Sequence, residues 1–279
     1  MVSGLVAKPL QGPSLKPGFA GPRTVVNMYS RPGKKVFHLI FHSGVDLASL
    51  AKASEGFIRL NVSVLSGTLV ADGRGGAHWC VFVETDQPEV GKDELARALK
   101  ATGRVTDITV LGGDDIIIDE AHFPLKLATG QRAYLLSDEV IRGMLARVRE
   151  VLGTGGDVVI FEEGEAVGRG DFEALKGMLG ADVPARLARL AGMYVSAGIG
   201  IPDIVEVDLA ARRAVVRVYD NIECVGVRSR VPYSEWVRGH LTGVGSALLG
   251  VPMKTEETKC VATGDPYCEF VISDRSRGA

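Results

Sequence analysis

The chain has 279 residues, more than the roughly 100–200 residues of a typical domain, so two domains are expected. Its formal net charge is −2 with acidic and basic residues interspersed, which disfavours nucleic acid and anionic membrane surfaces as partners. Hydrophobic residues make up 46% of the sequence, but no run reaches the ~20 apolar residues of a membrane-spanning helix. We therefore expect a soluble, cytoplasmic protein.

The N-terminus is rich in proline and glycine and lacks the charged and apolar regions of a signal peptide. Residues 1–33 are therefore predicted to form an extended leader. Asparagine and glutamine occur three times each in the whole chain, as expected where hot growth selects against thermolabile amides. This composition favours a thermophilic source.

Residues 34–112 predict a first domain with the order strand, helix, strand, strand, helix, strand. The strands have buried or alternating apolar patterns, the helices have helical spacing, and a glycine-rich loop at 72–76 joins the middle strands as a hairpin. This βαββαβ order is typical of the ferredoxin-like α/β fold, in which two helices cover one face of a four-stranded antiparallel sheet. The predicted elements are residues 36–41, 46–53, 61–71, 78–84, 92–101 and 104–110.

The turn around Ser43 and Gly44 resembles the glycine-bearing turn of ACT-type regulatory domains, which bind small ligands such as amino acids. The resemblance rests on topology and on Gly44, and His42 stands where such domains carry an acidic residue. It implies that Gly44 belongs to an effector site, where backbone N–H groups of the following helix receive a carboxylate. The alternative is that Gly44 only satisfies a tight turn.

After the turn at 112–115 the pattern changes, and residues 116–279 are predicted to form a second α/β domain. Ser137 precedes a long amphipathic segment that is typical of a capped helix ending at Gly153. The elements expected further along are a strand at 157–161, helices at 172–179 and 184–197, a hairpin of 204–209 with 214–219, a helix at 232–249, and strands at 254–262 and 267–272.

Three of the four cysteines fall in this second domain, together with a nearby glutamate. The turn at 263–266 predicts that Cys260 and Cys268 lie side by side on a hairpin. Because side chains alternate along a strand, Glu257 reaches the same side as Cys260 only through a bulge or the end of the strand. Cys224 would join them from elsewhere in the domain.

Three thiolates and one oxygen suit tetrahedral Zn²⁺, and a site filled by protein ligands is structural. Two alternatives stay open: a disulfide between Cys260 and Cys268 with Cys224 merely buried, or three unligated core cysteines. The fourth cysteine, Cys80, follows Trp79 in a predicted strand and is expected to be a core thiol.

The second domain resembles the vinyl-4-reductase-type domain. The resemblance rests on Cys224 and on the segments 236–243 and 257–270, and 123–124 and 164–168 fit its front half. It implies an α/β fold shared with vesicle-tethering subunits. In aromatic-sensing bacterial regulators, the same domain binds zinc through positions that match Cys224, Glu257, Cys260 and Cys268, and encloses an apolar ligand. The spacing from Cys224 to Glu257 is longer here than in those sensors.

The helix at 232–249 carries Gly239 and Gly243 at four-residue spacing, so its backbone must lie close to another helix or to a second subunit. With the amphipathic helix after Ser137, this stripe predicts a homodimer. Tyr194, Trp236 and His240 are candidate pocket residues, with a plain core placement as the alternative.

These features favour a regulatory protein that binds a small apolar or aromatic molecule. The alternatives are an enzyme or carrier acting on a tetrapyrrole, as the name vinyl reductase suggests, and a dimeric scaffold without a ligand. No nucleophile–base arrangement or dinucleotide-binding fingerprint is present in the sequence, so an enzyme is the less favoured class.

Overall fold

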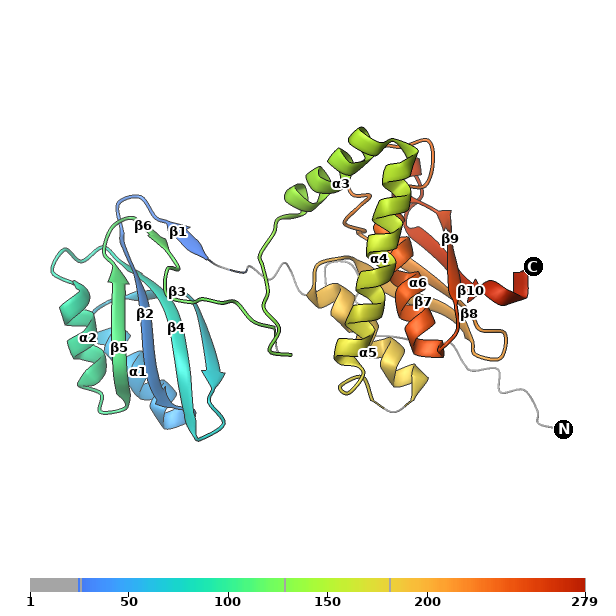
Figure 1. Cartoon of the computed structure of the whole chain (residues 1–279). Helices are drawn as coiled ribbons and strands as arrows, with labels where there is room; N and C mark the ends of the chain where they lie inside the picture. The colour runs from blue at the N-terminus through green and yellow to red at the C-terminus, as the bar shows by residue number, and fades with distance from the viewer. Residues whose placement is uncertain (1–24, 26, 128, 181, 279) are drawn as a thin grey trace. The chain divides into compact units, whose positions relative to one another are not determined.

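The computed structural model describes residues 25–278 except 26, 128 and 181. The chain divides into two compact units, one ending at Pro124 and the other beginning at Leu125 (Figure 1). Most of the predicted leader, residues 1–24, lies outside the described residues. Its end is not an extended leader, because Met28–Ser30 forms strand β1 and pairs with β6, Ile116–Ile118. That pairing places β6 in the first unit rather than at the start of the second.

The first unit has the predicted ferredoxin-like fold. Its antiparallel sheet has the strand order β3-β4-β2-β5, and helices α1 and α2 cover one face of it. Phe37, Leu39 and Phe41 of β2 point into that side and form a core with Phe57 and Leu95 of the helices. The bounds are β2 Lys35–Gly44, α1 Leu47–Arg59, β3 Ser63–Ala71, β4 Gly76–Thr85, α2 Lys92–Lys100 and β5 Val105–Gly112.

The second unit packs helices against a second antiparallel sheet of order β7-β8-β10-β9. This arrangement confirms the α/β prediction for the C-terminal half. Among the described residues, none of the helices combines the length and apolarity needed to cross a bilayer. The bounds are α3 Asp138–Leu152, α4 Thr154–Leu175, α5 Val183–Ser196, β7 Ile201–Asp208, β8 Arg213–Tyr219, α6 Glu235–Leu249, β9 Met253–Lys259 and β10 Cys268–Asp274.

One prediction of secondary structure in this unit is wrong. The expected strand at 157–161 and helix at 172–179 are replaced by the single long helix α4. The apolar run before Glu162 is typical of a strand when taken alone. In the structure the buried positions Ile160, Gly164, Gly168 and Phe172 recur every four residues, so packing against another helix overrides the local preference.

That other helix is α6, which lies beside α4 (Figure 1). A Cβ on Gly164 or Gly168 of α4 would collide with backbone carbonyl groups of α6, and a Cβ on Gly239 or Gly243 of α6 would collide with carbonyl groups of α4. Four glycines therefore let the two backbones touch. The partner of the glycine stripe is a helix of the same domain, so the stripe no longer supports a homodimer.

The amphipathic helix α3 begins as predicted, with the Ser137 hydroxyl accepting a hydrogen bond from the Val140 N–H. None of its residues is fully buried in the described chain. Val140, Met144, Val151 and Leu152 are exposed apolar residues on it. They remain the support for the predicted homodimer.

The glycine contact can be tested with a matched pair of variants on α4. Gly168→Ala places a Cβ against the backbone of α6, so we expect the free energy of unfolding to fall by about 1–3 kcal/mol. Gly170→Ala adds a Cβ in open space, and should raise it by up to about 1 kcal/mol through helix propensity. Urea unfolding followed by circular dichroism measures both, and equal effects would contradict the contact.

Candidate metal centre and adjacent hollow

The structure brings together the four side chains that the sequence predicts as zinc ligands. Cys224 lies in the loop after β8, Glu257 in β9, Cys260 directly after β9, and Cys268 at the start of β10. Their candidate ligand atoms all lie within 4.8 Å of one another, and the three cysteines are fully buried. Loop and hairpin therefore meet at one point, the arrangement a four-ligand metal site requires.

The predicted irregularity in the hairpin is confirmed. Lys259 lies opposite Glu269, whereas Glu257 lies opposite Phe270, so Thr258 is an extra residue on β9. This bulge changes which side of the strand the following residue faces. It brings Glu257 and Cys260, which are three residues apart, to the same side.

The sulfur atoms are spaced for a shared ion rather than for a bond. The Sγ atoms of Cys224 and Cys260 lie 3.6 Å apart, well beyond the roughly 2.05 Å of a disulfide. All four cysteines are free thiols. Two thiolates at about 2.3 Å from a tetrahedral Zn²⁺ would lie roughly 3.8 Å apart, which is close to the spacing found. The disulfide alternative does not fit this geometry.

Ser234 is a member of the site that sequence analysis missed. Its hydroxyl donates to Glu257 Oε1 at 2.7 Å and lies 3.0 Å from the Sγ of Cys224, and its N–H donates to Glu257 Oε2 at 3.1 Å. Its place before α6 indicates a helix cap, yet its side chain makes no cap hydrogen bond. The serine instead fixes the orientation of the carboxylate.

Backbone groups of the hairpin turn complete the surroundings of the thiols. The N–H of Val261 lies 3.4 Å from the Sγ of Cys268, and the N–H of Cys260 donates to the Asp265 carboxylate at 3.0 Å. Donors of the first kind stabilise negative charge on a thiolate. The turn at 263–266 therefore shapes the site as well as reversing the chain.

The four groups crowd potential negative charge into a buried place. Burial raises the pKa of Glu257 to about 8. Contact with Cys260 raises the pKa of the Cys224 thiol, while contact with Cys224 lowers that of Cys260. Without a cation these groups must hold protons, because buried unpaired charges are costly. A divalent ion would supply the missing charge, and the donor set fits zinc.

The three predicted pocket residues also come together, at the crossing of α5 and α6. The Tyr194 hydroxyl lies 2.7 Å from His240 Nδ1, and Trp236 stacks on the His240 ring with centroids 5.2 Å apart. Burial raises the pKa of Tyr194, so the hydroxyl stays protonated and donates to His240. His240 Nε2 in turn lies 3.1 Å from Asp171. The group forms a hydrogen-bonded chain from the core towards the surface.

A hollow of about 330 Å³ lies elsewhere, between α3 and the loop that carries Cys224. Tyr194, Trp236 and His240 do not line it. The lining combines small or apolar residues with polar side chains. It consists of Arg142, Gly143, Leu145, Ala146, Arg149, Glu223, Val225, Gly226, Val227 and Tyr233.

Arg149 is the central polar residue of the hollow. Its guanidinium lies 3.8 Å from the centre of the Tyr233 ring, and it contacts Asp157 at 2.8 Å and Glu223 at 3.4 Å. Its Nη1 is buried and has no hydrogen-bond partner among the described residues. Burial raises the pKa of Glu223 to about 7, so this carboxyl can donate or accept a hydrogen bond near neutral pH.

Gly44, the candidate effector residue of the first unit, ends β2 and packs against the start of α1. The N–H of Ser49, where a ligand carboxylate was expected, donates to the Asp46 side chain at 3.0 Å. A Cβ on Gly44 would lie 2.7 Å from the side chains of both Asp46 and Ser49. The glycine is therefore required for a close cap, and its effector role stays a prediction.

Comparison with known proteins identifies the type of the C-terminal segment. Residues 214–274, from β8 to β10, match the vinyl-4-reductase domain family, and no curated protein matches the chain. This segment includes Cys224, Glu257, Cys260 and Cys268.

Three solved structures are similar to about half of the chain. The phenol-responsive sensory domain of the transcription activator PoxR, with phenol, is 22% identical, and the match covers 52% of this chain and 77% of that chain with a TM-score of 0.47. For a vinyl-4-reductase family protein from Methanocaldococcus jannaschii the values are 17%, 51%, 83% and 0.38. For trafficking protein particle complex subunit 3 from Naegleria fowleri, covalently bound to palmitic acid, they are 14%, 50%, 95% and 0.41. All three TM-scores lie below 0.5, so these likenesses assign no ligand or activity to this chain. The chain contains a segment of the vinyl-4-reductase domain type at residues 214–274.

Proposed function

We propose that the C-terminal unit is a regulatory domain that binds a small aromatic molecule and is held together by one structural Zn²⁺. The observation that carries the proposal is the convergence of Cys224, Glu257, Cys260 and Cys268 within 4.8 Å, inside the segment of the vinyl-4-reductase domain type. Four protein ligands leave no open coordination position, so the ion stabilises rather than catalyses.

The ion would join two parts of the unit that are far apart in sequence. Cys224 belongs to the loop after β8, and the other three ligands belong to the β9–β10 hairpin. Because ligand formation accompanies folding in such sites, the free energy of metal binding contributes to the stability of the whole unit. The loop that it holds is also the wall of the hollow, since Glu223 and Val225 flank Cys224.

The hollow has the chemistry of a site for a small aromatic molecule with a hydroxyl or carboxylate group. Its volume is at the lower end of the roughly 300–1,000 Å³ range of ligand pockets. Tyr233 offers an aromatic surface, and the Nη1 of Arg149, unpartnered among the described residues, offers a donor. A ligand there would contact both α3 and the metal-bound loop. Binding would thus tie an otherwise exposed helix to the core of the unit, which is a means of regulation.

A homodimer through α3 remains part of the proposal. The exposed Val140, Met144 and Leu152 are the apolar surface that a second copy would cover. Sedimentation equilibrium at micromolar concentration should show a dimer of the 29.6 kDa chain, and Met144→Glu should shift it towards monomer. A monomer at all concentrations would contradict the dimer without affecting the ligand or metal proposals.

The zinc proposal predicts different behaviour for a ligand and for its supporting serine. Cys260→Ser should lose about one zinc ion per chain and lower the melting temperature, because a four-ligand site is broken. Ser234→Ala keeps all four ligands and loses only the hydrogen bond to Glu257, so zinc affinity should fall about 10–100-fold. Elemental analysis and competition with a chromophoric chelator measure the two effects.

Ser229→Ala is the matched control, because Ser229 lies in the same loop and its hydroxyl accepts the Val231 N–H. It should leave zinc content and affinity unchanged. If Cys260→Ser keeps the zinc content of the wild type, these cysteines are core residues.

The hollow predicts that filling it removes ligand binding. A Cβ on Gly143 meets no atom within 4 Å, and Gly143 lines the hollow, so Gly143→Leu fills space without disturbing the fold. We expect the affinity for phenol, the molecule found with the PoxR domain, or for benzoate to fall by about 10-fold or more, as measured by calorimetry.

Gly170→Leu, at an open position of α4, should leave this binding unchanged. No binding to the wild type, or equal binding to Gly143→Leu, would contradict the site. Loss of binding in Tyr194→Phe alone would place the ligand at the Tyr194–His240 group instead.

A further inference from the structure

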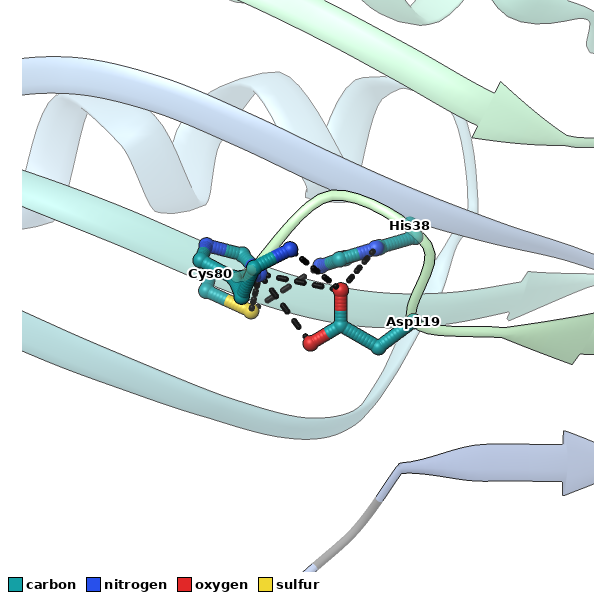
Figure 2. A group of neighbouring side chains, drawn as sticks. His38, Cys80 and Asp119 are labelled. Carbon is teal, nitrogen blue, oxygen red and sulfur yellow. Dashed lines mark hydrogen bonds and ion pairs between the residues drawn. The ribbon is translucent and has the colours of Figure 1, made fainter. Parts of the chain in front are cut away.

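A second group of metal-ligating side chains lies in the first unit, on the sheet face opposite α1 and α2. It consists of His38 of β2, Cys80 of β4, and Asp119 and His122 from the segment after β6. Figure 2 shows the His38, Cys80 and Asp119 side chains pointing towards one another. Sequence analysis expected Cys80 to be a core thiol and singled out none of the other three.

Strand register explains how two of these residues meet. Cys80 pairs with Ile40, the residue two positions after His38 on β2, so the side chains of Cys80 and His38 lie on the same face of the sheet. The ring of Phe82, which pairs with His38, stacks on the His38 imidazole with an interplanar angle of 9°. This stacking holds the imidazole in place beside Cys80.

The other two residues arrive on a turn that is tied to the unit. The N–H of Asp119 donates to Asn27 O at 2.8 Å, which continues the β1–β6 pairing. The Asp119 carboxylate accepts the N–H of Ala121 at 3.1 Å and contacts the Nδ1 of His122 at 3.0 Å. The turn therefore presents a carboxylate and a second imidazole to the sheet.

The four ligand atoms have the spacing of a metal coordination shell and all lie within 4.8 Å of one another. His38 Nε2 lies 2.9 Å and His122 Nδ1 3.9 Å from the Sγ of Cys80, and His38 Nδ1 lies 3.7 Å from Asp119 Oδ1. In a tetrahedron with ligand distances of about 2.0–2.3 Å, neighbouring ligand atoms are roughly 3.3–3.8 Å apart. The group is thus near this geometry before any ion is added.

A buried polar atom of the group lacks a hydrogen-bond partner among the described residues. The His38 side chain is 0% exposed, and its Nδ1 makes no hydrogen bond to any of them. Buried polar atoms are nearly always satisfied, so an orphaned ring nitrogen facing a carboxylate indicates a missing group. His122 and Asp119 are 31% and 18% exposed, which leaves a path from solvent.

We propose that His38, Cys80, Asp119 and His122 bind one Zn²⁺ ion. Two imidazoles, one thiolate and one carboxylate are all common zinc ligands, and this mixture of nitrogen, sulfur and oxygen suits a borderline cation. Binding displaces the Cys80 thiol proton to solvent and joins sulfur to the metal, so affinity falls in acid. The ion fixes the 119–122 turn to the sheet, and the site is independent of the C-terminal cysteines.

The same side chains also allow a different chemistry, a cysteine nucleophile with His38 as base and Asp119 as its partner. Two observations favour the metal. His122 supplies a fourth ligand that a nucleophile would not need, and it takes the closer contact with Asp119. Burial also raises the pKa of the Cys80 thiol, whereas reactive thiols have lowered pKa values.

The test counts zinc in the full-length protein after loading with Zn²⁺ and removal of excess ion by gel filtration. Cys80→Ser and His122→Ala should each lose about one ion per chain relative to the wild type, since a four-ligand site holds one ion. Cys260→Ser should retain the ion that depends on Cys80. His78→Ala is the matched control, because His78 is exposed on β4 with its ring centre 6.5 Å from that of His122. It should lose none.

A second measurement needs no variant. In the wild type, bound Zn²⁺ should abolish alkylation of Cys80 by iodoacetamide, and a chelator should restore it, as read by peptide mass spectrometry. The proposal is overturned if Cys80→Ser and His122→Ala keep the zinc content of the wild type. It is also overturned if Cys80 is alkylated equally fast with zinc and with chelator, the result expected of a thiol–imidazole pair.

Discussion

The contact between the backbones of α4 and α6 is the constraint on which the C-terminal unit depends. Four glycines remove the side chains that would hold these helices apart. Interior glycines cost helix propensity, roughly 1 kcal/mol each, so the contact must offset that cost through packing. The position of α6 then fixes everything attached to it. Ser234 at its start holds Glu257, and His240 on its buried side meets Tyr194 and Asp171.

Buried polar groups in both units are arranged around points of unbalanced charge. At Cys224 and its neighbours, three thiols and a carboxyl meet in a buried place. At Arg149 the reverse holds, because one donor of a buried cation has no acceptor among the described residues. At His38 a ring nitrogen is likewise without a hydrogen-bond partner in the described chain. In each place the protein has desolvated groups that a bound ion or small molecule would satisfy.

The sequence predicted those features that depend on local pattern. The βαββαβ order followed from alternation and turn residues, and the bulge beside Glu257 followed from its odd spacing to Cys260. Helix α4 was missed because its apolar run favours a strand until the contact with α6 is known. Ser234 and the His38 group were missed for another reason. His38 and Cys80 are brought together by strand register across 42 residues, and no local spacing records that.

The pairing of β1 with β6 has a consequence for how the first unit is connected. These strands are the entrance and the exit of the unit, and Met28 lies opposite Ile118 in their ladder. Neighbouring strands are separated by only about 5 Å. The ninety or so residues between them therefore form a closed excursion, like a bead tied off at its neck. A cassette of this shape can be transplanted into a surface loop of another protein without stretching the host, because the gap it must bridge is one strand wide.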